Sequence, residues 1–120
     1  MSKIELNVPE GIPSTENSKE FHQGMVDRMC ISYCKYGRVA EGFPNRVDAI
    51  GSLEARLEKY KQDGNTEWLM DAANYAMIEF MHPRHPKAHF RPTDDRESPG
   101  RKWHGEVDPL KLKNDITKHV

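Results

Sequence analysis

Four acidic residues are spaced so that they could bind a metal ion. Glu54 and Glu58 are four residues apart, and so are Glu67 and Asp71. On a helix, residues four apart lie on the same face, so each pair would present its oxygens to one side. Carboxylate oxygens of this kind hold Mg²⁺ against a phosphate substrate, and the metal can activate water. Two antiparallel helices that carry these pairs could therefore form a magnesium site.

The alternative for Glu54 and Glu58 is a solvated helix surface. Both residues lie close to Arg56 and Lys59 in the sequence. Oppositely charged side chains on an exposed helix face form weak pairs, worth a few tenths of a kcal/mol each. Spacing alone leaves both interpretations open.

The stretch TEWLMDAANYAMIEFM, residues 66–81, places polar groups inside an otherwise apolar run. Asp71 and Asn74 lie well inside this run. Helical spacing puts Asp71, together with Asn74 or Tyr75, on the face that also carries Glu67. The polar groups therefore converge, and we expect Asp71, Asn74 and Tyr75 to contact a ligand.

The segment after residue 82 is rich in proline, arginine and histidine, and it is a second candidate binding region. Planar arginine and histidine donors suit phosphate or carboxylate recognition, and prolines reduce the entropy lost when a loop becomes ordered. The candidate ligand-binding residues are Arg84, His85, His89, Arg91 and Arg101. The alternative is a polar tail whose arginines pair with nearby acids, namely Asp94, Asp95 and Glu97.

Three helices must position these residues. Apolar periodicity predicts helices over 18–36, 46–62 and 66–81, with Asn17 and Glu20 at capping-box spacing before the first. No segment alternates in the manner of a strand, so we expect an all-α bundle of three to four helices. We place an N-terminal arm at residues 1–16, the helical core at 17–82 and an extended segment at 83–120, which could end in a short helix.

Composition limits the partners of the protein. The chain has 120 residues, 36% of them hydrophobic, and a net charge of -1, so we expect no general attraction to nucleic acid or to an anionic membrane. No apolar run approaches the length of a membrane span, and no signal peptide is visible, so we expect a cytoplasmic protein. Three helices enclose only a thin core, and we expect self-association to complete it. Cys30 and Cys34 are one helical turn apart and are predicted to be packed thiols.

The run EWLMDAANYAMIEFM resembles a helix of the MazG-like all-α nucleotide pyrophosphohydrolases. In that family, two helices supply Glu-x-x-Glu and a later one supplies Glu-x-x-Asp, often followed by Asp-x-x-Asn. The resemblance implies a helical oligomer that binds Mg²⁺ and cleaves a nucleotide between its α and β phosphates. Asp71 and Asn74 match the last motif, whereas Trp68 stands where the family has an acid, with Glu67 one position earlier.

A longer stretch, from Glu20 to Arg101, resembles small proteins of bacteriophages, especially those that infect actinobacteria. Its motifs include VDAIGSLEARLEKY and ESPGR. This resemblance implies work on nucleotides of an infected bacterial cell, including cyclic nucleotides used as defence signals.

Three hypotheses follow. The first is a protein that captures a nucleotide with little or no turnover, because the acids are displaced from the family pattern. The second is a Mg²⁺-dependent pyrophosphohydrolase that uses Glu54, Glu58, Glu67 and Asp71 as ligands. The third is a non-catalytic interaction bundle in which Asp71 and Asn74 only fasten an interface.

Overall fold

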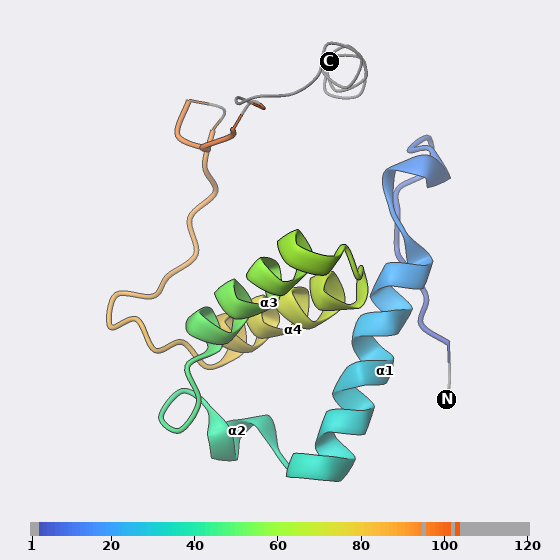
Figure 1. Cartoon of the computed structure of the whole chain (residues 1–120). Helices are drawn as coiled ribbons and strands as arrows, with labels where there is room; N and C mark the ends of the chain where they lie inside the picture. The colour runs from blue at the N-terminus through green and yellow to red at the C-terminus, as the bar shows by residue number, and fades with distance from the viewer. Residues whose placement is uncertain (1–2, 95, 102, 104–120) are drawn as a thin grey trace. The chain divides into compact units, whose positions relative to one another are not determined.

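The computed structural model describes residues 3–94, 96–101 and 103, and these residues form helices and no strand. The prediction of an all-α protein is therefore confirmed. The chain divides into two compact units, Met1–Ala88 and His89–Val120. Each unit is described by itself. Figure 1 shows the helices of the described residues, which lie in the first unit. They are η1 (Ser14–Glu16), α1 (Lys19–Tyr36), α2 (Val39–Gly42), α3 (Ala49–Asp63) and α4 (Glu67–Met81).

Helix α1 begins one residue later than the predicted capping box requires. The hydroxyl of Ser18 accepts a hydrogen bond from the backbone N–H of Phe21, at 3.0 Å, so Ser18 is the N-cap in place of Asn17. Serine satisfies an N–H group that the helix itself leaves without a partner. The helix ends at Gly37, whose φ of 83° is strained for residues with a side chain.

Helix α3 begins three residues after the predicted start at 46. The carboxylate of Asp48 accepts a hydrogen bond from the backbone N–H of Gly51, at 3.0 Å, and this N-cap leaves residues 46–48 outside the helix. At its other end, Gly64 adopts the left-handed conformation, with φ 74° and ψ 8°. A glycine in this conformation terminates a helix at no steric cost.

Thr66 is the N-cap of α4 and makes no side-chain cap hydrogen bond, and the side chains of the residues before it form a short network at the start of the helix. Asn65 accepts a hydrogen bond from the backbone N–H of Glu67 at 3.0 Å, and Asp63 accepts one from the backbone N–H of Asn65 at 2.8 Å. The indole N–H of Trp68 also donates to Asp63, at 3.0 and 3.1 Å. The helix ends at Met81, two residues before Pro83, because the residue before a proline disfavours the helical conformation.

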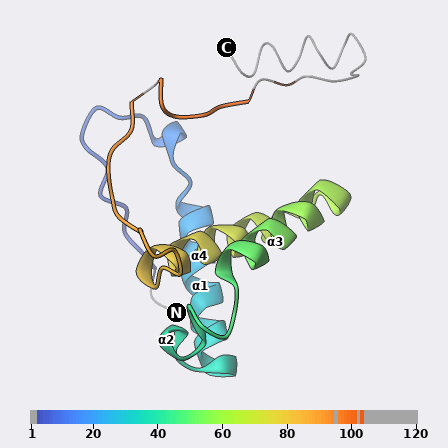
Figure 2. The same ribbon diagram turned by 90° about the vertical axis from the view of Figure 1, so that its left-hand side faces the viewer.

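The three long helices form a hairpin and a crossing helix. Helices α3 and α4 are joined by three residues and therefore run antiparallel, side by side, in both Figure 1 and Figure 2. Helix α1 crosses α4 and packs on it. Gly24 allows this approach, because a Cβ at that position would come within 2.5 Å of the Met70 sulfur.

The core of this arrangement is small. Among the described residues, the buried hydrophobic side chains are those of Ala49, Ala72 and Ile78. No residue of α1 is buried, although it has 18 residues. Within the described part of the chain, no helix is both long and apolar enough to cross a membrane. The predicted helix near residue 109 lies outside the described residues.

Sequence patterns did not predict two short elements. The 3-10 turn Ser14–Glu16 lies inside the arm, and α2 lies in the loop that follows α1. Both are too short for apolar periodicity to be visible. Helix α2 is nevertheless important for the candidate site, because it places residues next to the C-terminal half of α1.

Candidate functional site

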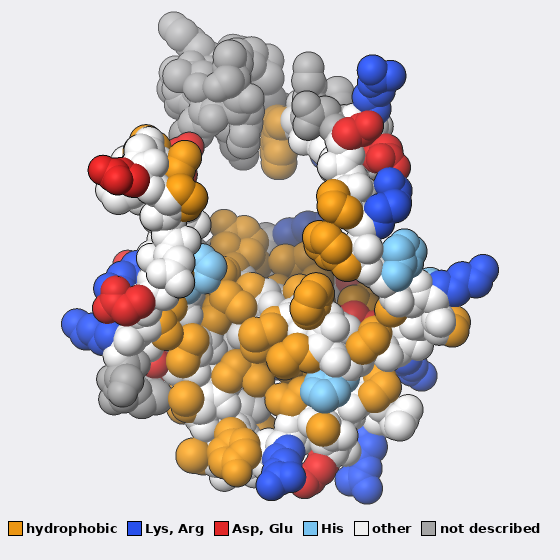
Figure 3. Space-filling model, turned by 180° about the vertical axis from the view of Figure 1, so that it is seen from behind, with side chains coloured by type: hydrophobic (Ala, Val, Ile, Leu, Met, Phe, Trp, Pro, Cys, Tyr) orange, Lys and Arg blue, Asp and Glu red, His pale blue; other side chains and the backbone are white. Residues whose placement is uncertain are grey.

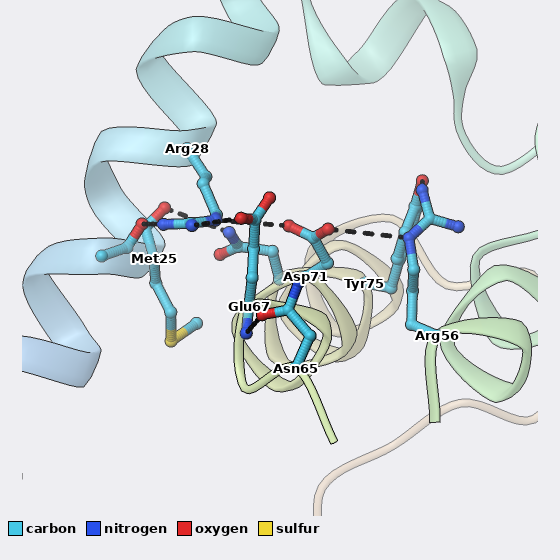
Figure 4. Close-up of polar contacts among 9 residues, drawn as sticks. Met25, Arg28, Arg56, Asn65, Glu67, Asp71 and Tyr75 are labelled. Atoms are coloured by element: carbon cyan, nitrogen blue, oxygen red, sulfur yellow. Dashed lines mark hydrogen bonds and ion pairs between the residues drawn. The ribbon is translucent and has the colours of Figure 1, made fainter. Parts of the chain in front are cut away.

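Arg28 of α1 joins two acids of α4. Its Nη2 atom lies 3.4 Å from Oε2 of Glu67, and its Nε atom lies 3.6 Å from Oδ1 of Asp71. The side chain of Asp71 is 26% exposed and that of Arg28 30%, so the contact is largely shielded from water. Figure 4 shows Arg28 reaching from α1 towards both carboxylates. The predicted face that carries Glu67 and Asp71 is thus turned towards α1.

The second oxygen of Asp71 faces Arg56 of α3. The distance from Oδ2 to the Arg56 Nε atom is 3.7 Å. Arg56 also donates a hydrogen bond from Nη2 to the Tyr75 hydroxyl at 3.4 Å, and its guanidinium lies 5.2 Å from the centre of the Tyr75 ring. The ring of Trp68 is 5.8 Å from the same guanidinium. Asp71 is therefore placed between two arginines from different helices, as Figure 4 shows.

Asn74 ties α4 to the backbone of α1. It is 6% exposed, and its side-chain N–H donates to the carbonyl of Met25 at 3.0 Å. Among the described residues, the amide oxygen of Asn74 has no hydrogen-bond partner although it is buried. A buried amide that holds a backbone carbonyl fixes the spacing of two helices. Asn74 therefore has a structural contact that explains its place in an apolar run.

A pocket of about 730 Å³ lies against Asp71 and Tyr75. Helices α1, α2, α3 and α4 and the loops beside α2 all contribute to its lining. We call it the α1–α4 pocket. Its volume is in the range of pockets that hold small molecules, about 300–1,000 Å³. Of the predicted ligand-binding residues, Asp71, Asn74 and Tyr75 line this pocket.

The part of the α1–α4 pocket formed by the end of α1 and the residues beside α2 is cationic and aromatic. Lys35 is in the last turn of α1, Arg38 precedes α2, and both line the pocket with Tyr36 and Phe43. Phe43 packs on Tyr75, with the ring centres 6.3 Å apart and the planes tilted by 56°. Cations next to aromatic rings suit a ligand that has an anionic group and a planar ring.

Some charged side chains of the pocket form ion pairs and others do not. The cationic residues are Arg28, Lys35, Arg38 and Arg56, and the acidic residues are Asp27, Glu67 and Asp71. Glu67 and Asp71 pair with arginines, whereas no ion pair involves Lys35 or Arg38 within the described residues. Among the same described residues, Asp27 has no ion pair either and accepts a hydrogen bond from Gln23, but it lies in the middle of α1, so the pocket charges without an ion pair beside α2 are the two cations, Lys35 and Arg38.

The four predicted metal ligands do not converge in the described structure. Glu54 and Glu58 are exposed on α3 and do not line the α1–α4 pocket, which Glu67 and Asp71 do. Both Glu67 and Asp71 face guanidinium groups. Among the described residues, no three histidine, cysteine, aspartate or glutamate side chains are grouped as a metal site would require. The donor set does not fit a Mg²⁺ ion in this arrangement.

The predicted cations at the start of the C-terminal segment lie apart from the pocket lining. Arg84 and His85 are exposed and follow α4. The backbone N–H of Arg84 donates to Glu79 at 2.8 Å, and Nδ1 of His85 accepts from the backbone N–H of Lys87 at 2.9 Å. These contacts shape the chain after α4, and neither residue lines the α1–α4 pocket.

The remaining predicted cations, His89, Arg91 and Arg101, belong to the second unit. Arg91 makes two hydrogen bonds to Glu97, at 2.6 and 3.2 Å. This contact raises the pKa of Arg91 and lowers that of Glu97, in each case mainly through the side-chain hydrogen bond. For Arg91, the structure shows the pairing with a nearby acid that the alternative interpretation expected. Arg101 is exposed.

Several pocket residues were not among the predicted ligand-binding residues, namely Arg28, Lys35, Arg38, Phe43 and Arg56. Lys35 and Arg38 have a simpler explanation in the sequence, because a helix dipole favours cations at its C-terminus whatever the function. A sequence signal for Arg28 did exist. It lies between Met25 and Met29, in a helix whose repeating apolar residues are expected to face the interior, and a charged residue there indicates a polar partner. Phe43 carries no periodic signal, since it lies in a loop.

No family model, curated protein or solved structure matches this chain. The two resemblances therefore depend on the sequence motifs that carry them.

Proposed function

We propose that this protein binds a nucleotide in the α1–α4 pocket and captures it with little or no turnover. The observation that carries the proposal is the combination of Lys35 and Arg38, which have no ion-pair partner among the described residues, with aromatic rings in a pocket of about 730 Å³. The cations would bind phosphate, and Phe43 or Tyr36 would stack on the base.

The motif resemblances are the reason for proposing a nucleotide rather than another anionic ligand. The run that contains Asp71 and Asn74 is similar to a helix of nucleotide-cleaving proteins, and both residues line the pocket. The similarity to small phage proteins extends the proposal to cyclic nucleotides that act as defence signals in an infected bacterium.

Capture is favoured over hydrolysis by the pairing of the acids. A catalytic Mg²⁺ needs carboxylate oxygens that are open to it. Asp71 uses both oxygens on Arg28 and Arg56, and Glu54 and Glu58 do not line the pocket. The guanidinium groups of Arg28 and Arg56 therefore occupy the oxygens of Asp71 that a metal ion would need.

Binding is tested by isothermal titration with nucleoside mono-, di- and triphosphates and with cyclic mono- and dinucleotides. We expect at least one of them to bind and to raise the melting temperature, and to be recovered intact after heat denaturation. If the ligand is recovered as monophosphate and pyrophosphate when Mg²⁺ is present, the protein is an enzyme and capture is wrong. If no member of the panel binds, the proposal fails as a whole.

A matched pair of charge reversals locates the site. Lys35 is in the last turn of α1 and lines the pocket, and Lys61 is in the last turn of α3 and does not. Both substitutions, Lys35→Glu and Lys61→Glu, place an acid at the negative end of a helix, so they cost similar stability. We expect Lys35→Glu to weaken nucleotide binding about tenfold or more, equivalent to about 1.4 kcal/mol, and Lys61→Glu to leave it unchanged.

A further inference from the structure

The two cysteines of the chain, Cys30 and Cys34, are exposed, so the prediction that they are packed thiols is wrong. They lie one turn apart on α1, and both are free. Free cysteine is among the residue types that are most often buried, because its thiol packs like a small hydrophobic group. Two exposed thiols on one face of a helix therefore need an explanation other than packing.

Both thiols line a hollow that is rich in sulfur, which we call the sulfur-lined hollow. Helices α1 and α4 form it, together with Ile4 of the N-terminal arm. It shares Met29 and Asn74 with the α1–α4 pocket, whereas neither cysteine lines that pocket. The side chains of the sulfur-lined hollow that could bind a soft metal ion are those of His22, Met25, Met29, Cys30, Cys34 and Met77.

The chemistry of the sulfur-lined hollow favours a soft ion over a hard one. Among the described residues that line it, none is an aspartate, glutamate, lysine or arginine. Figure 3 shows one face of the molecule on which hydrophobic side chains, a class that there includes methionine and cysteine, lie close together. Thiolate and thioether sulfur select ions such as Cu(I), whereas Mg²⁺ and Ca²⁺ prefer oxygen.

The number of thiols also favours Cu(I) over zinc. A structural zinc site takes four ligands from cysteine, histidine and acidic residues. Among the described residues, no three side chains of these types are grouped in this way. A Cu(I) ion needs fewer ligands, because two thiolates on opposite sides of it already form a stable complex.

The spacing of Cys30 and Cys34 suits an ion between them better than a disulfide. On a helix, Cβ atoms four residues apart are separated by about 5–6 Å, whereas a disulfide needs a separation of about 3.5–4.5 Å. A metal–sulfur bond is about 2.3 Å long for zinc, so two sulfur atoms on one ion lie up to about 4.6 Å apart. One ion can therefore bridge the two thiolates on a regular helix.

We propose that the sulfur-lined hollow binds one Cu(I) ion, with the thiolates of Cys30 and Cys34 as its ligands and the methionines as a thioether lining. Each thiol gives up its proton when the ion binds, so one ion displaces two protons and copper keeps its oxidation state. Methionine is flexible and polarisable, so a thioether can approach the ion and shield it from water. The ion also ties together two turns of a helix that has no buried residue.

The first experiment titrates the reduced full chain with Cu(I) in the absence of oxygen, in competition with a coloured Cu(I) chelator. We expect one ion per chain and a melting temperature that rises when the ion binds. A chain that takes no copper from the chelator overturns the proposal, and so does half an ion per chain, because two chains would then share one ion. Neither thiol lines the α1–α4 pocket, so nucleotide binding is tested separately.

The second experiment removes each ligand in turn. Cys30→Ser and Cys34→Ser exchange one sulfur atom for oxygen on an exposed side chain, so both variants should fold. We expect either one to weaken Cu(I) binding about a hundredfold or more, because serine is not a soft ligand. If both variants bind Cu(I) as tightly as the unaltered chain does, the cysteines are not the ligands and the proposal is wrong.

A transplanted pair distinguishes this site from any two thiols one turn apart. Glu54 and Glu58 are exposed on α3 and lie outside the sulfur-lined hollow. In a chain with Cys30→Ser and Cys34→Ser, the changes Glu54→Cys and Glu58→Cys recreate the same spacing there. We expect this variant to bind Cu(I) about tenfold more weakly than the unaltered chain, because it lacks the thioether lining. Equal affinities would show that the hollow adds nothing to its thiols.

Two methionines of α4 provide a matched test of the thioether lining. Met77 lines the sulfur-lined hollow, and Met81, one turn later, does not. Leucine replaces methionine with little change in volume. We expect Met77→Leu to weaken Cu(I) binding about threefold or more and Met81→Leu to leave it unchanged. The same affinity in both variants would contradict a role for the thioether of Met77.

Discussion

The Nε atom of Arg28 lies 3.6 Å from Oδ1 of Asp71, and this contact joins α1 to α4. Asp71 also faces Arg56 at 3.7 Å, so one carboxylate holds α1, α3 and α4 together. We expect Asp71→Ala to lower the free energy of unfolding by about 1–3 kcal/mol, because two partly buried guanidinium groups lose their counter-charge. Urea denaturation measures this loss.

Glu58→Ala is the control for Asp71→Ala. Glu58 is an exposed acid of α3 without an ion pair among the described residues, so its removal should change the free energy of unfolding by less than about 0.5 kcal/mol. The double variant Arg28→Ala, Asp71→Ala should lose less than the sum of the two single variants. Strict additivity would show that Arg28 and Asp71 are not coupled.

The left-handed conformation of Gly64 gives a second prediction. This residue ends α3 with φ 74°, and a Cβ there would meet no atom within 4 Å, so any cost of a side chain is a backbone cost. We expect Gly64→Ala to lower the free energy of unfolding by about 1 kcal/mol and Gly64→Asn to lower it less, because asparagine tolerates this region.

Gly100→Ala is the control for Gly64, since its Cβ would also meet open space and its φ is not in the left-handed range. It should not destabilise the protein. Equal melting temperatures for Gly64→Ala and the unaltered protein would contradict the claim that α3 needs a glycine at its C-cap.

Asp63 supplies a pH-dependent prediction. Its carboxylate accepts hydrogen bonds from the backbone N–H of Asn65 and from the indole of Trp68, and these bonds, the first above all, lower the pKa of Asp63 from its ordinary value of 3.8. A group whose pKa is lower in the folded protein contributes stability above its unfolded pKa. That contribution is lost as the pH falls through the folded value.

We therefore expect Asp63→Asn to reduce the melting temperature at neutral pH and to have less effect as the pH falls below 3.8. The fluorescence of Trp68 provides a direct measurement, because its indole contacts the carboxylate. In the unaltered protein the fluorescence should change with a midpoint below the ordinary pKa. A stability difference that stays constant from neutral pH down to strongly acidic pH would contradict the hydrogen-bond explanation.

The sequence predicts the long helices well and the candidate site only in part. Apolar periodicity and capping signals are local, so α1, α3 and α4 begin and end within a few residues of their predicted positions. The face shared by Glu67 and Asp71 was also predictable, because it depends only on helical spacing. What these acids contact was not, since Arg28 and Arg56 are brought to Asp71 by the packing of α1 and α3 against α4, which local sequence signals do not specify.

The predicted role of the C-terminal segment depended on composition alone. Arginine and histidine beside proline suit phosphate binding, but they suit pairing with acids equally well, and the sequence cannot choose between these partners. For Arg91 the partner is Glu97. For the pocket, the cations without an ion pair in the described structure, Lys35 and Arg38, come from the end of α1 and the loop after it. The helix dipole alone explains cations at these positions, so the sequence did not mark them as ligand-binding residues.

The last prediction separates these two cationic regions. Arg38→Glu changes a pocket residue without an ion-pair partner in the described structure, whereas Arg91→Glu changes a residue whose two guanidinium nitrogens already bind Glu97. If the pocket alone contacts the nucleotide, Arg38→Glu should weaken binding about tenfold or more, and Arg91→Glu should change the dissociation constant by less than about twofold. Isothermal titration measures both constants. The double variant Arg91→Glu, Glu97→Arg restores the pair with opposite polarity, and it should bind as the unaltered protein does. A large loss with both Arg91 variants would instead mean that the C-terminal segment contacts the ligand, as its composition first suggested.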